Sequence, residues 1–330
     1  WVAGATNAVE RSSCVTTVGE NISSEFVFRT AAAPLRSSSL TLQYSRASGG
    51  VQTVTADSTG AISAPGVDGV VDYDTGAVRW RFGAKVVAAG NEDEPWFDAA
   101  NVDGDGNIWK PAPVMSSTVQ YTAVAYSYLP LDASIIGLDP VRLPNDGRVP
   151  IFRAGGFAVV GHTASLTATV SNAQTIDCAR VRLSRVRVIG ANGVVINTGY
   201  TADLEAGTVT FTDVAGYSQP VTIEHRIEDM AVVREALING QLSFTRPLTH
   251  DYPVGSYVSS ALVAGDKFAR TSIVFDQATW TNVWSDGVIG SPATGTFNDV
   301  TYPITVTNRG ALTERWVVRF TNSTSFEIIG

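Results

Sequence analysis

Apolar and polar residues alternate through most of this 330-residue chain, and glycine, aspartate and asparagine interrupt the alternation at short intervals. The runs 40–45, 51–55 and 77–82 show the pattern most clearly. A strand points successive side chains to opposite faces of its sheet, so a period of two predicts strands with one buried face. The one segment with helix signals, 228–237, also alternates, and we expect a strand there. Many short strands separated by turn residues predict an all-β fold, with two or more β-sandwich or barrel-like domains and little helix.

A weak internal repeat indicates that two of these domains are related. Residues 73–80 (YDTGAVRW) match residues 204–211 (LEAGTVTF). Each has an apolar residue, a polar turn, a glycine and an alternating Val-x-aromatic strand. Upstream, residues 40–51 parallel residues 186–195 in the same way. The glycine suits the positive φ of a hairpin turn, and the strand after it suits a buried face.

A connector rich in proline, aspartate and glycine separates the two copies at residues 126–156. Repeated prolines stiffen a linker and fix its turns. We therefore predict an N-terminal β domain over 1–139, with a loop insertion at 91–113. A C-terminal β region follows over 140–330 and subdivides near residue 275.

The charge balance argues against a nucleic-acid partner. The chain has 23 Lys and Arg against 31 Asp and Glu, a net charge of −8, whereas nucleic-acid binding depends on basic residues that neutralise phosphates. The densest basic run, 180–187, alternates with apolar residues, and we interpret it as the solvated face of a strand.

Cysteine usage and hydropathy argue against a disulfide-stabilised or membrane-spanning protein. Cys14 and Cys178 are far apart and in no CxxC motif, so we expect buried free thiols. No apolar run reaches the ~18 residues of a membrane span. The chain begins at Trp1 and stops within a strand-like run at Gly330, and we expect a segment of a longer polypeptide.

One loop has the spacing of a calcium-binding loop, with glycine at its sixth position and an apolar residue at its eighth. Its candidate ligands are Asn101, Asp103, Asp105 and Asn107. The twelfth position, where a carboxylate normally closes the shell, is Ala112, so acidic residues in 92–98 would have to supply it. An Asp-Gly turn forms readily without an ion and is the favoured interpretation. Calcium is the only cofactor for which the sequence offers a candidate site.

The histidines form no catalytic or zinc motif. His162, His225 and His250 stand alone, without HxH or HExxH spacing. Glu224–His225 and His250–Asp251 are local pairs that we interpret as hydrogen-bonding groups of a surface or interface. No GxSxG elbow, P-loop or GxGxxG is present. The prediction is that the chain is not an enzyme; a glycan hydrolase, whose two carboxylates meet only in space, is the weakest alternative.

Four tryptophans raise the question of sugar binding, because exposed indoles stack on carbohydrate faces. They are Trp96, Trp109, Trp280 and Trp284, and the last two lie in a segment rich in Thr, Asn, Ser and Asp. Tryptophan is also enriched in protein interfaces. We favour the interface and keep glycan binding as its rival.

Five runs together resemble a tail structural protein of long-tailed bacteriophages. They are 137–152 (GLDPVRLPNDGRVPIF), 224–230 (EHRIEDM), 244–252 (FTRPLTHDY), 275–280 (FDQATW) and 307–316 (TNRGALTERW). The resemblance covers roughly residues 120–330. It implies a virion component at the tail tip or baseplate, assembled in a ring with copies of itself and with other tail proteins.

The sequence thus predicts a structural protein of the phage tail that works through protein–protein contacts. Arg and Trp are frequent interface anchors, and the candidate contact residues are Arg226, Arg246, His250, Asp251, Trp280 and Trp284. The alternative is a receptor- or glycan-binding module of the adhesin or tail-fibre type, with host surface glycan as its partner.

Overall fold

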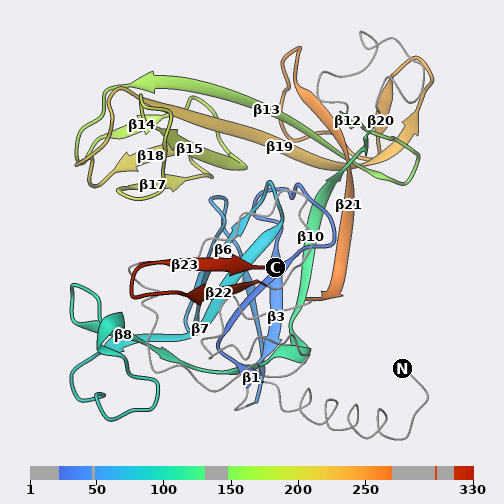
Figure 1. Ribbon diagram of the computed structural model, residues 1–330. Coiled ribbons are helices and arrows are strands. Elements are labelled where there is room, and N and C mark those ends of the chain that lie inside the picture. The colour runs from blue at the N-terminus through green and yellow to red at the C-terminus, as the bar shows by residue number, and fades with distance from the viewer. Residues whose placement is uncertain (1–21, 47–48, 131–147, 270–301, 303–315) are drawn as a thin grey trace, which may run out of the picture.

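The computed structural model describes residues 22–46, 49–130, 148–269, 302 and 316–330 (Figure 1). In these ranges only two three-residue 3₁₀ turns are helical, η1 (Ala99–Asn101) and η2 (Ser116–Thr118). All other regular elements are strands in antiparallel sheets, which confirms the all-β prediction. The expected strand at 228–237 lies largely within β19 (Val221–Ala236). No helix in the described part of the chain is long and apolar enough to cross a membrane.

The N-terminal sandwich packs two sheets around an aromatic core. One sheet has the order β2-β7-β6-β5, with β8 also paired to β7. Its bounds are β2 (Glu25–Arg29), β7 (Ala77–Val87), β6 (Val67–Asp72), β5 (Ala61–Ala64) and β8 (Asn107–Pro111). The facing strands are β4 (Val51–Thr55), β3 (Thr41–Ser45) and β10 (Gln120–Ser127). Trp80 and Phe82 alternate with polar residues along β7 and are both 1% exposed; the Phe82 ring lies 4.5 Å from that of Tyr44.

The C-terminal sandwich repeats this design with aliphatic residues. One sheet has the order β14 (Thr175–Asp177), β18 (Thr208–Phe211), β17 (Tyr200–Asp203). It faces β16 (Val195–Ile196), β15 (Arg185–Ile189), β19 and β13 (Phe157–Ala168). Val186 and Val188 point into the core, whereas Arg185 and Arg187 lie half-buried on the other face. The predicted strand over 180–187 is present only from Arg185 onward: Arg180 and Arg182 lie before β15, and Arg185 and Arg187 are half-buried rather than fully solvated.

One continuous sheet joins the two sandwiches. Its order is β16-β15-β19-β13-β21-β10-β3-β4, with β20 (Leu242–Phe244) also paired to β19 and β21 spanning Tyr257–Phe268. In Figure 1, β13 and β19 run together to the C-terminal sandwich, and β10 and β21 run together to the N-terminal one. The two sandwiches therefore share a backbone ladder at β13–β21.

The predicted hairpin repeat is present in the structure. In β6–β7, Asp72 is opposite Ala77, and in β17–β18, Asp203 is opposite Thr208. Gly76 has φ +71° and its N–H donates to the carbonyl of Asp72 over 2.8 Å; Gly207 has φ +73° and donates to the carbonyl of Asp203 over 2.8 Å. The matched glycines therefore form the same turn.

The neighbouring strands of the two hairpins also correspond. Phe28 of β2 is opposite Val78, and Ile176 of β14 is opposite Val209. The backbone N–H of Thr30 donates to Gly76, and that of Cys178 to Gly207. In the facing sheets, Leu42 lies opposite Tyr121 as Val188 lies opposite Ile223. β2, β3, β4, β6, β7 and β10 thus correspond to β14, β15, β16, β17, β18 and β19.

The shared ladder relates the two sandwiches by an approximate two-fold axis. Phe157 pairs with Ala261 and Gly161 with Tyr257, symmetrically about the pair Val159–Ser259. A turn with a positive-φ glycine, at Gly155 and at Gly255, precedes each strand. β13 and β21 are therefore equivalent strands, and the order of the eight strands is symmetric about the β13–β21 pair.

Short strands complete the described chain: β1 (Ile22–Ser23) pairs with β9 (Val114–Met115), β11 (Leu129–Pro130) with β12 (Arg148–Val149), and β22 (Val317–Phe320) with β23 (Phe326–Ile329). One buried cluster is built from residues 26–125 and a second from 170–227. The boundaries predicted at 140 and near 275 lie outside the described residues, so that division stays a prediction.

Candidate functional site

The predicted contact residue Arg226 lies at the seam between the two sandwiches. Its Nε donates to Glu228 Oε2 over 2.8 Å, and Arg36 of the N-terminal sandwich donates from Nε to Glu228 Oε1 over 2.5 Å. The Tyr126 hydroxyl donates to Oε2 over 2.7 Å. The Glu228 side chain is only 2% exposed. One buried carboxylate therefore holds groups of both sandwiches.

Electrostatics at the seam follow from this burial. Burial, and then the charge of Glu228, raises the pKa of Tyr126, which stays a hydrogen-bond donor. Burial alone would lower the pKa of Arg226, but the adjacent Glu228 carboxylate outweighs burial and raises it. A buried carboxylate that accepts hydrogen bonds from three donors holds the two sandwiches rigidly against each other.

The predicted contact residue His250 is held by Asp229, which follows Glu228 on β19. Asp229 Oδ2 accepts from the backbone N–H of Thr249 over 2.8 Å and of His250 over 3.1 Å, and lies 3.3 Å from His250 Nδ1. The Thr249 hydroxyl donates to Oδ1 over 2.6 Å. Burial raises the pKa of Asp229, but these hydrogen bonds outweigh burial and hold it below its usual value. This cluster fixes the loop between β20 and β21, on which Arg246 and Asp251 are exposed.

The two local pairs expected from the sequence are wrong. Neighbouring residues on a strand point to opposite faces. Glu224 therefore pairs across the sheet with Arg187, at 3.5 Å, and His225 turns into the sandwich at 5% exposure. His250 contacts Asp229, while Asp251 is exposed.

His225 belongs to a buried polar group at one end of the C-terminal core. In the β13–β19 register His162 is opposite Ile227 and Ala164 is opposite His225, so the two histidines share a face. Burial, then the charges of Arg180 and His162, lower the pKa of His225. The Nδ1 atoms of both histidines and Nη1 of Arg180 are buried without a hydrogen-bond partner among the described residues. Ordered water commonly satisfies such atoms.

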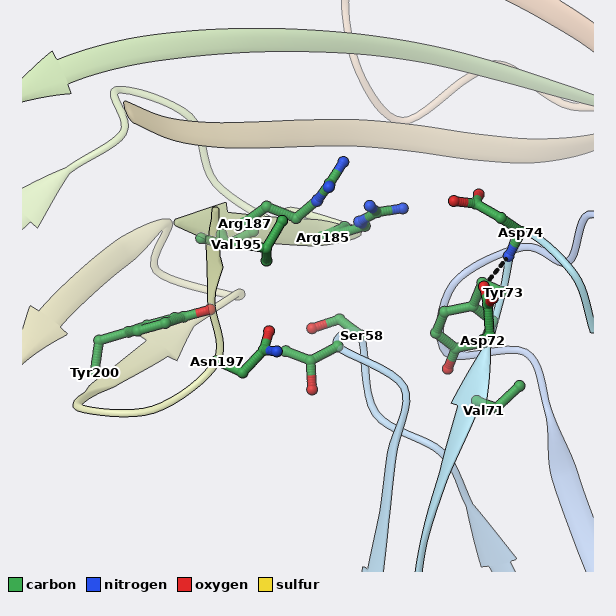
Figure 2. Close-up of a pocket in the computed structure, with 12 residues that line it drawn as sticks. Ser58, Val71, Asp72, Tyr73, Asp74, Arg185, Arg187, Val195, Asn197 and Tyr200 are labelled. Carbon is green, nitrogen blue, oxygen red and sulfur yellow. Dashed lines mark hydrogen bonds between the residues drawn. The ribbon is translucent and has the colours of Figure 1, made fainter. Parts of the chain in front are cut away.

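A polar cleft lies between the sandwiches (Figure 2), with a volume of about 140 Å³. The C-terminal side contributes Arg185 and Arg187 of β15, with Val186, Val195, Asn197 and Tyr200. The N-terminal side contributes the β6–β7 turn around Asp72, Tyr73 and Asp74, with Val71, Ser58 and Thr59. The cleft is smaller than the ~300–1,000 Å³ of typical small-molecule pockets.

Arg185 is a half-buried charged group of this cleft. Burial, then the neighbouring charge of Arg187, lowers its pKa, and Asp74 and Glu224 oppose that shift. Among the described residues Arg187 has Glu224 as an ion-pair partner, whereas Arg185 has none. The cleft therefore offers a guanidinium donor to a small anionic or hydroxyl-bearing group.

The aspartate-rich loop joins β7 to β8 and is organised by Asp103. Asp103 Oδ1 accepts from the backbone N–H groups of Asp105 over 3.0 Å and Asn107 over 2.8 Å, and Lys85 Nζ lies 2.5 Å from Oδ2. The Lys85 side chain, then the backbone of Asn107, keep the pKa of Asp103 below its usual value. No group of three or more His, Cys, Asp or Glu side chains within the described ranges is placed to hold a metal ion. The loop is an Asp turn with a lysine counter-ion, and calcium binding stays the untested alternative.

The described tryptophans of the sugar-binding hypothesis contact cations. The Arg81 guanidinium lies 4.3 Å from the centre of the Trp109 ring, and Lys110 Nζ lies 5.8 Å from that of Trp96. Both indoles are half-buried. Trp280 and Trp284 lie outside the described residues, so their predicted contacts stay predictions.

Searches against protein-family models, curated proteins and solved structures find no match to this chain.

Of the predicted contact residues, Arg226 contacts Glu228 and His250 contacts Asp229, which are adjacent residues of β19. Arg246 and Asp251 are exposed. Sequence reasoning missed Glu228, Asp229 and Arg185. The available signal was the uncommon Glu-Asp pair in an otherwise alternating strand, because acidic residues on both faces of a strand need partners on both.

Proposed function

We propose that this protein is a non-enzymatic structural component of a phage tail, at its tip or baseplate, and that it acts by binding other tail proteins and copies of itself. The observation that carries the proposal is the fusion of two equivalent sandwiches through one continuous sheet. A part of a particle under mechanical load benefits from domains that cannot rotate freely. A shared backbone ladder and a buried three-donor carboxylate supply that restraint.

The resemblance to phage tail proteins gives this assembly role its setting. The runs that carry it include residues 224–230 and 244–252, which contain the seam residue Glu228 and the anchored residue His250. Structural components need surfaces held in fixed positions, and both clusters fix the loops beside them.

The test is to label this protein in its virion. A short tag is added to the gene in the phage genome, and gold-labelled antibody locates the tag on purified particles by electron microscopy. We expect label at the tail tip or baseplate. Infectious particles that lack the protein by mass spectrometry would refute the proposal.

A second function, glycan binding, is favoured by the cleft between the sandwiches. Arg185, Asn197 and Tyr200 line it together with Ser58 and Asp72, a mixture of planar, hydroxyl and charged groups that suits a sugar with an acidic substituent. A glycan array with the parent chain and an Arg185→Ala variant tests it. Loss of a specific signal in the variant would support this function, and an array without signal for the parent chain would remove it.

A further inference from the structure

We propose that β21 is an exchangeable strand, and that the place between β10 and β13 accepts β21 of a second copy of this chain. Two chains then assemble by reciprocal strand exchange. The proposal deepens the assembly function above and rests on it, because it names one partner and its mode of contact.

The first argument is where β21 comes from. In the C-terminal sandwich the strand beside β19 is β13, which directly precedes the rest of that sandwich in sequence. In the N-terminal sandwich the equivalent strand, beside β10, is β21, which enters only after the whole C-terminal sandwich. The N-terminal sandwich is thus completed by a strand from a distant part of the chain. Domain swapping exchanges an identical element between protomers, and β21 is the element of the N-terminal sandwich that enters last.

The second argument is how β21 is held. β13 carries Ala158, Val159 and Val160, which are all at most 5% exposed, whereas β21 buries Ser259 and Ser260 near its start. Further along β21, Leu262 and Phe268 are 53% and 66% exposed. The strand is held by its two backbone ladders, to β10 and β13, and by a few side-chain hydrogen bonds, such as that of the Ser260 hydroxyl to the Ser127 carbonyl. An identical strand from another copy restores every one of those bonds.

The third argument is the connection before β21. Residues up to His250 are fixed on Asp229, and only 251–256 separate this anchor from β21. Val254 in that segment is fully exposed, and Gly255 has φ +88° with open space around it. Short hinge loops favour exchange over closure within one chain. Tyr252 packs against the C-terminal core, so the part of the segment that can straighten is 253–256.

The seam permits the exchange without separating the sandwiches. Arg36 and Tyr126 of the N-terminal sandwich both donate to Glu228 of the C-terminal sandwich, and β21 takes no part in these bonds. Each chain therefore keeps its own pair of sandwiches, and only the inserted strand is reciprocal. Because each copy gives and receives the same strand, the dimer closes on itself.

The test uses cysteines at one β10–β21 pair, Val124 and Val263, which lie opposite each other. A tagged Val124→Cys chain is co-expressed with an untagged Val263→Cys chain, and disulfides are read on non-reducing gels after mild oxidation. The matched control is Thr41→Cys with Thr55→Cys, a pair within the local β3–β4 hairpin. The parent chain gives the background from Cys14 and Cys178. Gln120→Cys with Phe268→Cys is a second β10–β21 pair, for use if the first fails to fold.

We expect a disulfide-linked dimer from the mixed β10–β21 variants and none from the mixed control variants. If the mixed chains stay monomeric while the Val124→Cys/Val263→Cys double variant cross-links within one chain, exchange is refuted. Absence of any cross-link in the double variant also refutes it. The double variant, locked within one chain, then separates the two proposals: if it still enters virions, the tail function stands although strand exchange has failed.

Discussion

Replacing Glu228 by glutamine tests whether the seam holds the two sandwiches together. The carboxylate accepts hydrogen bonds from Arg36, Tyr126 and Arg226, and glutamine keeps its shape while removing its charge. Breaking a fully buried ion pair by removing one partner costs about 3–5 kcal/mol. The side chains of Arg36 and Arg226 are 27% and 25% exposed, so water compensates part of the loss. We expect the free energy of unfolding to fall by about 2–3 kcal/mol.

The matched control is Glu224→Gln on the same strand. Glu224 faces Arg187 at 3.5 Å with both side chains more than a third exposed, so its loss should cost below about 1 kcal/mol. Urea denaturation followed by circular dichroism measures both variants. Hydrogen exchange resolved along β10 and β19 then shows whether the seam has loosened, because a chain with two cores need not unfold in one step. Equal losses for the two variants, with unchanged exchange at the seam, would refute the reasoning.

Three further outcomes follow from single positions. Gly207→Ala should destabilise by about 3 kcal/mol or more in urea, because its Cβ would lie 1.6 Å from the Arg180 carbonyl oxygen; Gly193→Ala, at a similar φ in open space, should cost about 1 kcal/mol. Because the folded pKa of Asp229 is lowered, its stabilisation is complete above the unfolded value of about 3.9 and disappears as the pH falls through the folded pKa. Asp229→Asn should therefore lower the Tm at neutral pH and lose less than the parent chain on acidification, as calorimetry at several pH values would show. Calcium added after EDTA should leave the Tm unchanged, since Lys85 already holds Asp103; a rise would establish an ion site.

The strands were predictable because alternation and turn chemistry are local. Val78 and Trp80 follow Gly76 just as Val209 and Phe211 follow Gly207, and the spacing alone places these side chains on a buried face. The return of β21 to β10 was not predictable. Nothing within 257–268 identifies which sheet it joins, and a polar pair such as Ser259-Ser260 suggests an exposed face although both residues are buried.

The partners of the charged and histidine residues in 224–251 could not be predicted from sequence proximity. Sequence proximity suggested Glu224–His225 and His250–Asp251. Pleating separates the side chains of the first pair on β19, and in the second His250 contacts Asp229 instead. One partner of Glu228 is Arg36, 192 residues away, and His250 contacts Asp229, 21 residues away. Such pairs depend on sheet order, which local patterns do not contain.

The approximate symmetry explains why the two sandwiches pair with each other. Tyr126 of β10 and Glu228 of β19 occupy equivalent positions, and they bond directly to each other. A symmetric glutamate pair would place two carboxylates together, and a symmetric tyrosine pair would leave both arginines without an acceptor. The difference at this position therefore favours one N-terminal sandwich joined to one C-terminal sandwich. β21 takes no part in this bond. The pair therefore selects an N-terminal sandwich against a C-terminal one, and the proposed exchange of β21 leaves it intact.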